Sequence, residues 1–369
     1  MTDFDSSRIV PLNRPSLDVS EQNRVRDAIK SGWLTQNGSE VGQMENTLQN
    51  YFRGRTNQRN YVCKAVSNGT TALHLALIAA GVQQDDEVII PNFAYAAVAN
   101  SILYCHAIPV LVDVDYDTWN LNVNLVSEVI SERTKAIILV DNYGREANYS
   151  SLRSSLDSNI TIIRDACESF PFVNSQYPLT ANDFVTNSFY ANKIITSGEG
   201  GAIFGPEEKM QLVSVLRNQG VENAGTFQHS VLGYNYRISN LHAAIFNSQW
   251  MKLETLYAKR RSIFVSYANF FSKNFPNSNN NAESTPWLFT VQFKQDLTLM
   301  LREFLKAKLI ETRPGFTPFH RYSYLAKYRK GDYPVSCELS EQIVSFPTFP
   351  DLEDDEMDYI FKSLMKFNK

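Results

Sequence analysis

A lysine followed by a glycine-rich turn is the first group in this sequence that could do covalent chemistry. Lys193 lies in NSFYANKIITSGEGGAIFG, residues 187–205, between two apolar runs that resemble strands. A lysine beside the end of a sheet is partly desolvated, which favours the neutral amine that forms Schiff bases with carbonyl compounds. A solvated loop lysine is the commoner role for one such residue. Lys193 is therefore a candidate nucleophile that needs support from other residues.

The segment SNGTTALHLAL, residues 67–77, has the features of a phosphate site. The strand-like run VCKAV leads into Gly69 and Thr70, and a helix is expected to begin near Thr71. Free backbone N–H groups and the positive end of the helix dipole bind anions at such a point. Ser188, five residues before Lys193, could add a hydroxyl. A plain helix cap by Ser or Thr would look the same.

Two further residues could hold an aromatic cofactor ring. Asp165 ends the apolar run ITIIRD, where its carboxylate could bind the protonated pyridine nitrogen that makes pyridoxal 5′-phosphate (PLP) an electron sink. An Asp at a strand end also caps helices or binds sugars or metals. Tyr95, in PNFAY, could lie flat on the ring, although core packing is the commoner role of such an aromatic.

Elements that alternate between strand and helix must position these residues. The sequence predicts buried strands at Glu87–Ile90, Ile108–Val114, Lys135–Val140 and Ile160–Asp165, with helices at Thr71–Ala80, Tyr95–Cys105 and Leu125–Ser131. This alternation predicts an α/β fold with a mostly parallel sheet covered by helices on both faces. Ligands bind such sheets at the carboxyl ends of the strands.

The pattern changes after about residue 249. A long amphipathic helix is expected over residues 251–275, followed by a polar loop, a strand at WLFTVQF (residues 287–293), a helix at Leu297–Ala307 and a Pro/aromatic loop from Arg313 to His320. We therefore predict an N-terminal segment and large domain over residues 1–249, and a smaller α+β domain over residues 250–369.

Bulk properties narrow the function further. The chain has 369 residues, a net charge of −4, 43% hydrophobic and 20% charged residues, so no nucleic-acid partner is expected. The first ten residues do not resemble a signal peptide, and the charge-free stretch Val88–Val112 is broken by polar residues and prolines, so no membrane span is expected. Four separated cysteines indicate free thiols in the cytoplasm, and we expect no bound metal.

Taken together and in order, these motifs resemble the DegT/StrS-type sugar aminotransferases, which are fold-type-I PLP enzymes. The resemblance is carried by SNGTTALHLAL, PNFAYAAVAN, RDACE, SFYANKIITSGEGG, GYNYRISNLHAA and ETRPGFTPFH, and it spans nearly the whole chain. It implies that Lys193 holds PLP covalently, that Asp165 pairs with its pyridine nitrogen and that Tyr95 stacks on its ring. The phosphate positions are matched by Gly69, Thr70 and Ser188.

The resemblance also implies roles outside the cofactor cradle. Asn235, in GYNYR, matches an asparagine that reaches the PLP phosphate of the neighbouring subunit, which implies a homodimer with shared active sites. Arg313, Phe316 and His320 match the loop that contacts the sugar nucleotide. Glu168 matches a position that contacts the phenolic oxygen of PLP.

Three residues depart from the usual family pattern. Many relatives carry Gln or His where Glu168 stands, and a carboxylate there would repel the phenolate unless it were protonated or turned away. Arg164 replaces a usual acidic residue, and Cys167 a small one. Glu168, with KLIETRP and SFPTFP, resembles a subgroup that acts on a GDP-linked sugar.

The expected activity is transfer of an amino group from L-glutamate to a nucleotide-linked 4-keto-6-deoxy sugar, for O-antigen or another surface glycan. GDP-4-keto-6-deoxymannose is the first candidate for the acceptor, and dTDP- or UDP-linked keto sugars are the alternatives. A PLP-dependent sugar dehydratase, in which histidine replaces the lysine, and a non-catalytic PLP-binding regulator are the remaining alternatives. The sequence does not fix the nucleotide base, the carbon that is aminated or the stereochemistry.

Overall fold

A seven-stranded sheet forms the centre of the computed structural model, which describes residues 8–171, 179–180, 182–222 and 227–367. In spatial order the strands are β1 (Tyr61–Val66), β7 (Gly201–Pro206), β6 (Phe184–Ser188), β5 (Thr161–Asp165), β4 (Thr134–Val140), β2 (Glu87–Pro91) and β3 (Ile108–Val112). β7 is antiparallel to both of its neighbours, and the other pairings are parallel. The predicted mostly parallel α/β sheet is therefore confirmed.

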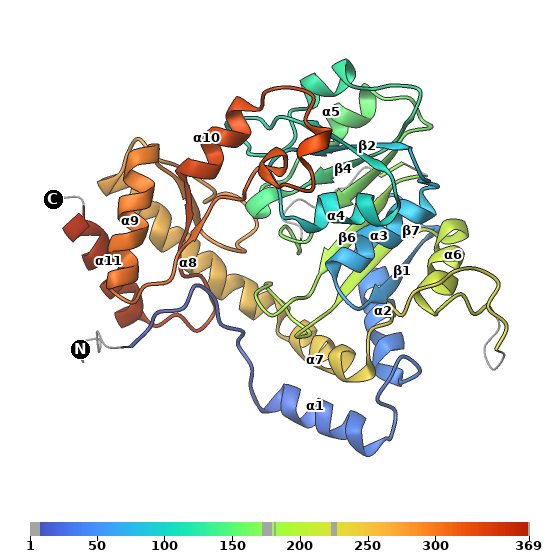
Figure 1. Cartoon of the computed structure of the whole chain (residues 1–369). Coiled ribbons are helices and arrows are strands. Elements are labelled where there is room, and N and C mark those ends of the chain that lie inside the picture. Colours follow the sequence, from blue (N-terminus) through green and yellow to red (C-terminus); the bar gives the residue numbers. More distant parts are fainter. Residues whose placement is uncertain (1–7, 172–178, 181, 223–226, 368–369) are drawn as a thin grey trace.

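Helices cover both faces of this sheet, because its strands are apolar on both sides. One face packs against α3 (Gly69–Ala79), α4 (Ala97–Tyr104) and α6 (Glu207–Arg217). The other packs against α2 (Ser39–Arg53), α5 (Tyr149–Ser154) and α7 (Asn240–Met251). Figure 1 shows α3 and α4 in front of the strands, with α1 (Val19–Lys30) lying beside α7.

A second, antiparallel sheet lies in the C-terminal part. Its order is β10 (Arg313–Pro314), β11 (Ile343–Ser345), β9 (Thr290–Gln292) and β8 (Asn279–Asn280). The helices of this region are α8 (Leu253–Asn274), α9 (Gln295–Ala307), α10 (Pro334–Gln342) and α11 (Asp354–Phe367). A phenylalanine-rich cluster forms its core, and Val10 joins it by bridging to Ile310.

The predicted helices differ from the observed ones by a few residues, and two of these differences change how the segment is described. The predicted helix at Leu125–Ser131 is a short 3₁₀ helix, η1 (Val123–Glu128), in which only Val126 is buried. Val123 and Leu125 are partly buried against the same core, so the segment packs as predicted but in the tighter 3₁₀ geometry. The helix predicted from Tyr95 begins at Ala97 instead, which leaves Tyr95 in the loop after β2.

The N-terminal helices were not predicted, although α1 carries a readable start signal. Asp18 accepts a hydrogen bond from the backbone N–H of Ser20, and Glu21 closes a capping box with Asp18. The first seven residues, on which the signal-peptide prediction rests, lie outside the described residues. Across the described part of the chain, no helix is both long enough and apolar enough to span a bilayer.

Candidate active site

A cavity of about 650 Å³ opens where β4, β5 and β6 end, against the start of α3 and the loop that carries β10. Nine residues singled out from the sequence line it: Gly69, Thr70, Tyr95, Asp165, Glu168, Ser188, Lys193, Arg313 and Phe316. They come from segments far apart in the chain, and they meet because parallel strands present their carboxyl ends at one edge. His320 and Asn235 are not among the lining residues.

The start of α3 forms one end of the cavity. Asn68 caps this helix by accepting a hydrogen bond from the N–H of Thr71. The N–H groups of Gly69 and Thr70 have no partner within the helix and remain available to an anion. A Cβ atom at Gly69 would lie 3.0 Å from Sγ of Cys167 and 3.1 Å from Cβ of Ser188. Glycine therefore keeps the backbone close to the floor of the cavity.

Asp165 lies at this floor, at the end of β5, and is 7% exposed. Its Oδ1 accepts a hydrogen bond of 3.1 Å from the backbone N–H of Cys167. Burial raises the pKa of Asp165, while Lys193 and the contacts with Cys167 act against that rise. A cationic partner in the cavity would favour the ionised carboxylate.

The amine of Lys193 lies in the same cavity, over an indole ring. Nζ is 4.1 Å from the ring centroid of Trp287. The backbone oxygen of Lys193 accepts a hydrogen bond from Arg260, a buried residue of α8. The lysine backbone, in the loop between β6 and β7, is thus tied to the C-terminal part of the chain.

Glu168 is held by the backbone of the residues that follow β4. Its Oε2 accepts a hydrogen bond of 2.7 Å from the N–H of Tyr143. Burial raises the pKa of Glu168 to about 7, opposed chiefly by the neighbouring Lys193. This carboxyl group can therefore carry a proton near neutral pH, the condition under which it would not repel a phenolate.

Two of the three predicted residues of the substrate loop line the cavity, and the third does not. Arg313 and Phe316 line the cavity, and the ring of Phe316 lies 6.3 Å from that of Tyr95. His320 is engaged elsewhere: its Nδ1 lies 2.8 Å from Nδ2 of Asn92, and its Nε2 lies 3.6 Å from Sγ of Cys337. These contacts attach the end of the loop to Asn92, which follows β2, and to Cys337 of α10.

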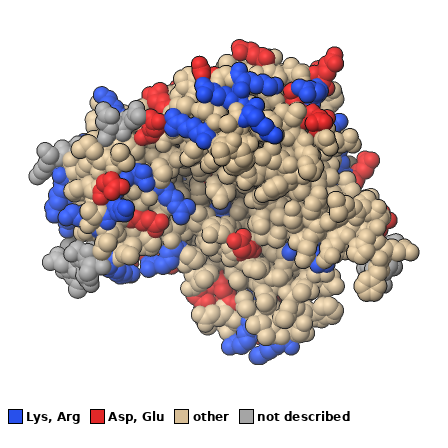
Figure 2. Space-filling view, in the orientation of Figure 1, with Lys and Arg blue, Asp and Glu red and all other residues tan. Residues whose placement is uncertain are grey.

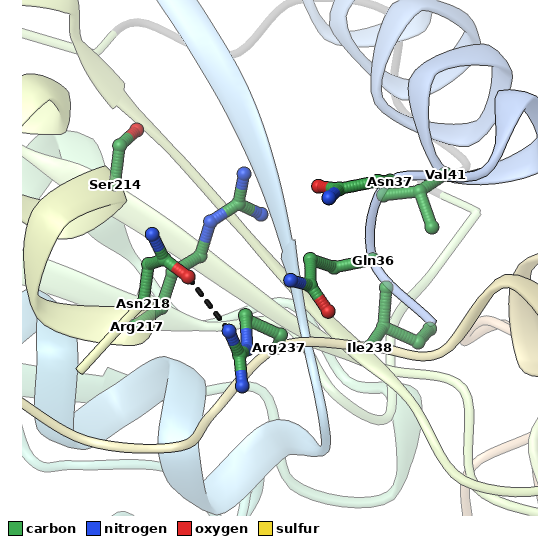
Figure 3. A pocket seen from close by; sticks show the side chains of 8 residues that line it. All are labelled: Gln36, Asn37, Val41, Ser214, Arg217, Asn218, Arg237 and Ile238. Carbon is green, nitrogen blue, oxygen red and sulfur yellow. Dashed lines mark hydrogen bonds between the residues drawn. The ribbon is translucent and has the colours of Figure 1, made fainter. Parts of the chain in front are cut away.

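Asn235 lies on the surface, outside the cavity. Its Oδ1 accepts hydrogen bonds from Nε and Nη2 of Arg237, at 3.2 and 2.8 Å. Arg237 lines a second cavity of about 180 Å³, where it also donates to Asn218, as the dashed line in Figure 3 marks. Because the amide oxygen is occupied, Asn235 presents its NH₂ group as a donor.

Sequence reasoning missed Tyr143 and Trp287, which also line the cavity. Tyr143 follows β4 just as Asp165 ends β5, so its place after a buried strand was the available signal. Trp287 had no such signal, because it approaches from the second sheet. The described residues contain no group of three His, Cys, Asp or Glu side chains that could hold a metal ion.

The sequence matches the DegT/DnrJ/EryC1/StrS aminotransferase family over residues 15–365. The chain belongs to this family. It is similar to the GDP-perosamine synthases of Escherichia coli O157:H7 and Vibrio cholerae, each at 32% identity, with 98% and 97% of this chain and 99% of each relative covered. A sugar aminotransferase of Streptococcus pneumoniae, Spr1654 in its PLP form, has the same fold, with a TM-score of 0.86 at 22% identity over 98% of this chain and 99% of the other.

Membership of the DegT/DnrJ/EryC1/StrS family makes the protein a PLP-dependent sugar aminotransferase with a fold-type-I architecture. The cavity fits that cofactor. An amine, a buried carboxylate and the anion-binding start of α3 all open on it, and the backbone at Gly69 leaves no room for a side chain. Lys193, Asp165 and the Gly69–Thr70 turn are the groups that would hold PLP.

The structure accounts for Arg164, which replaces the acidic residue usual in DegT/StrS-type enzymes. Its side chain is buried and pairs with the buried Asp141, with Nη2 2.6 Å from Oδ2. Arg164 and Asp165 are adjacent in β5, so their side chains point to opposite faces of the sheet. The arginine therefore belongs to an internal ion pair away from the cavity.

Proposed function

We propose that this enzyme transfers the amino group of L-glutamate to C4 of GDP-4-keto-6-deoxymannose and so produces GDP-perosamine for an O-antigen or another surface glycan. The observation that carries the proposal is that Arg313 and Phe316 open on the same cavity as Lys193 and Asp165. Full-length similarity to two GDP-perosamine synthases supports the choice of sugar nucleotide. A dTDP- or UDP-linked keto sugar is the alternative acceptor.

PLP, when bound, supplies an electron-withdrawing ring that carries the amino group from donor to acceptor. Lys193 would hold the cofactor covalently, and its free Nζ would take the proton from the donor's α-carbon. In the second half of the cycle the same amine returns a proton to C4 of the sugar. Asp165 holds the pyridine nitrogen protonated, while Ser188 and the Gly69–Thr70 turn bind the phosphate. Glutamate leaves as 2-oxoglutarate.

Cofactor contacts follow from the same proposal. Tyr95, which lines the cavity, would stack on the ring. Glu168, in its protonated form, donates a hydrogen bond to the phenolic oxygen of PLP. Arg313 and Phe316 bind the sugar nucleotide, and His320 positions their loop through Asn92.

We propose that the active unit is a homodimer in which each cofactor site uses both chains. The face over α3 and α4 shows almost no Lys, Arg, Asp or Glu (Figure 2), and the apolar ring of Tyr104, at the end of α4, is 51% exposed. Exposed apolar surface of this kind is typical of a protein interface. Asn235, whose NH₂ group is free to donate, would bind the phosphate in the partner's cavity.

We also propose the division into residues 1–249 and 250–369 as two domains. The seven-stranded sheet lies wholly in the first part and the four-stranded sheet wholly in the second. Limited proteolysis near residue 250 is the direct measurement.

Spectroscopy and a substrate panel test the proposed activity. The purified enzyme should absorb visible light when PLP is bound, and L-glutamate should bleach that band. GDP-, dTDP- and UDP-linked 4-keto-6-deoxy sugars are then added, and the aminated product is identified. Absence of bleaching would favour a non-catalytic regulator, and loss of a hydroxyl from the sugar would indicate a dehydratase, which Lys193 argues against. Amination of a dTDP- or UDP-linked sugar alone would refute the GDP-linked acceptor.

A further inference from the structure

Tyr143 is a buried residue of the cavity wall for which neither the sequence nor the family match provides a role. It follows β4 in the short 3₁₀ helix η2 (Asn142–Gly144), lines the cavity and is 2% exposed. Its φ of 54° lies in the left-handed region, which is strained for a residue with a side chain. Gly144 continues the turn with φ of 78°, where a Cβ would lie 2.3 Å from the oxygen of Thr285.

Contacts on every side fix the ring of Tyr143. The backbone N–H binds Oε2 of Glu168, and the backbone oxygen accepts a hydrogen bond of 2.8 Å from Asn281. The ring stacks on Phe316 with centroids 4.8 Å apart and planes at 22°. The Trp119 ring lies perpendicular to the Tyr143 ring, with centroids 5.8 Å apart. The phenol group therefore points in one fixed direction.

The hydroxyl group of Tyr143 has a hydrogen left to donate. Its oxygen accepts a hydrogen bond of 3.2 Å from the N–H of Phe316. Within the described part of the chain, no atom accepts a hydrogen bond from this hydroxyl. Burial, together with nearby Glu168, holds the pKa of Tyr143 well above its usual value, so the group stays protonated. A buried donor without an acceptor costs free energy, which a ligand oxygen would recover.

We propose that Tyr143 donates this hydrogen bond to an oxygen of the acceptor's sugar ring and so helps to select the sugar. The proposal rests on the proposed function, because it requires a sugar nucleotide in this cavity. Phe316, which belongs to the sugar-nucleotide loop, shares both a ring stack and a hydrogen bond with Tyr143. A sugar bound against Phe316 therefore lies beside the hydroxyl.

Calorimetric titration of the PLP-bound enzyme with GDP-mannose and with GDP tests the contact. Tyr143→Phe keeps the ring and the backbone bond to Glu168, and removes only the hydroxyl. GDP-mannose should bind about 5- to 10-fold more weakly, as expected for one neutral hydrogen bond, whereas GDP, which lacks the sugar, should change by less than twofold. The matched control is Tyr267→Phe. It removes another buried hydroxyl, which donates to the backbone oxygen of Pro347 in the phenylalanine-rich core of the C-terminal part. It should leave both affinities unchanged.

Equal affinity of wild type and Tyr143→Phe for GDP-mannose would overturn the proposal. Equal weakening of GDP-mannose and GDP would also overturn it, because the hydroxyl would then act only by positioning the Phe316 loop. If wild type binds neither GDP ligand, the titration is repeated with the dTDP-glucose/dTDP and UDP-glucose/UDP pairs. If one of those pairs binds, the GDP-linked acceptor is refuted, and the Tyr143 contact is tested with that pair instead. If none binds, both the proposed acceptor and the Tyr143 contact are refuted.

Discussion

Lys193 and Trp287 meet across the boundary between the two sheets, with the lysine Nζ 4.1 Å from the centroid of the indole ring. Lys193 comes from the loop between β6 and β7, and Trp287 from the segment that leads into β9. Nε1 of Trp287 also donates a hydrogen bond of 3.1 Å to the backbone oxygen of Asn192. The ring thus binds both the side chain of the lysine and the backbone beside it, which keeps the amine inside the cavity.

Lys193→Ala should abolish both covalent attachment of PLP and transamination, because it removes the nucleophile and the general base together. The measurements are the visible absorbance of the reconstituted protein and product formation from glutamate. Lys259→Ala, which changes only an exposed ion pair with Asp351, should behave as wild type. Turnover by Lys193→Ala would contradict the assignment of this lysine.

Asp165→Asn should still bind PLP but lose most of its rate. The asparagine can accept the hydrogen bond from Cys167, yet it carries no charge to keep the pyridine nitrogen protonated. Single-turnover bleaching by glutamate measures the loss, with the exposed Asp157→Asn as control. Near-normal rates would mean that another group pairs with the cofactor.

Relative to wild type, the unfolding free energy of Glu168→Gln should increase as pH rises. The native pKa of about 7 lies above the ordinary value of 4.5, so native Glu168 holds a proton that the unfolded chain has lost between these values. Its contribution to stability is therefore complete below pH 4.5 and is lost as pH rises through 7. Glutamine does not titrate, so the difference in unfolding free energy should grow by at most about 3 kcal/mol between pH 4.5 and 8.

Urea unfolding of PLP-free protein across this range measures the effect. The exposed Glu128→Gln is the control and should track wild type at every pH. Asp141, whose pKa is also raised by burial, titrates in both proteins, so the difference retains only its electrostatic interaction with Glu168. A pH-independent difference for Glu168→Gln would show that the buried carboxyl is ionised throughout.

Asn235→Ala should weaken PLP binding by about one to two decades, since it removes one hydrogen bond to a charged phosphate, worth roughly 1.5–3 kcal/mol. A mixed dimer decides which chain the asparagine serves. When a Lys193→Ala chain pairs with an Asn235→Ala chain, a shared-site dimer concentrates both defects in one cavity. Half of the sites should then bind PLP normally. If no intact site remains, the asparagine serves its own chain.

The sequence determined those features that follow from local pattern. Asp165 ends an apolar run and Gly69 begins a helix after one, so both lie at the carboxyl edge of any parallel sheet built from these segments. The order of the motifs identified the family because each motif places one group around the same cofactor. At Leu125–Ser131 the structure has a 3₁₀ helix over Val123–Glu128, because hydrophobic spacing in so short a segment does not separate 3₁₀ from α geometry.

Only the tertiary structure decided which side chains face the cavity. Trp287 lies 94 positions after Lys193 in the sequence. The two side chains meet only because of where the second sheet lies, which no local pattern predicts. Tyr143 adopts a left-handed backbone because Glu168, Asn281 and Phe316 hold it from three directions. The side chain of His320 likewise contacts Asn92, a residue far from it in the sequence. Hydrogen-bond partners distant in sequence become neighbours only when the sheets have packed, and packing then selects the direction of each side chain.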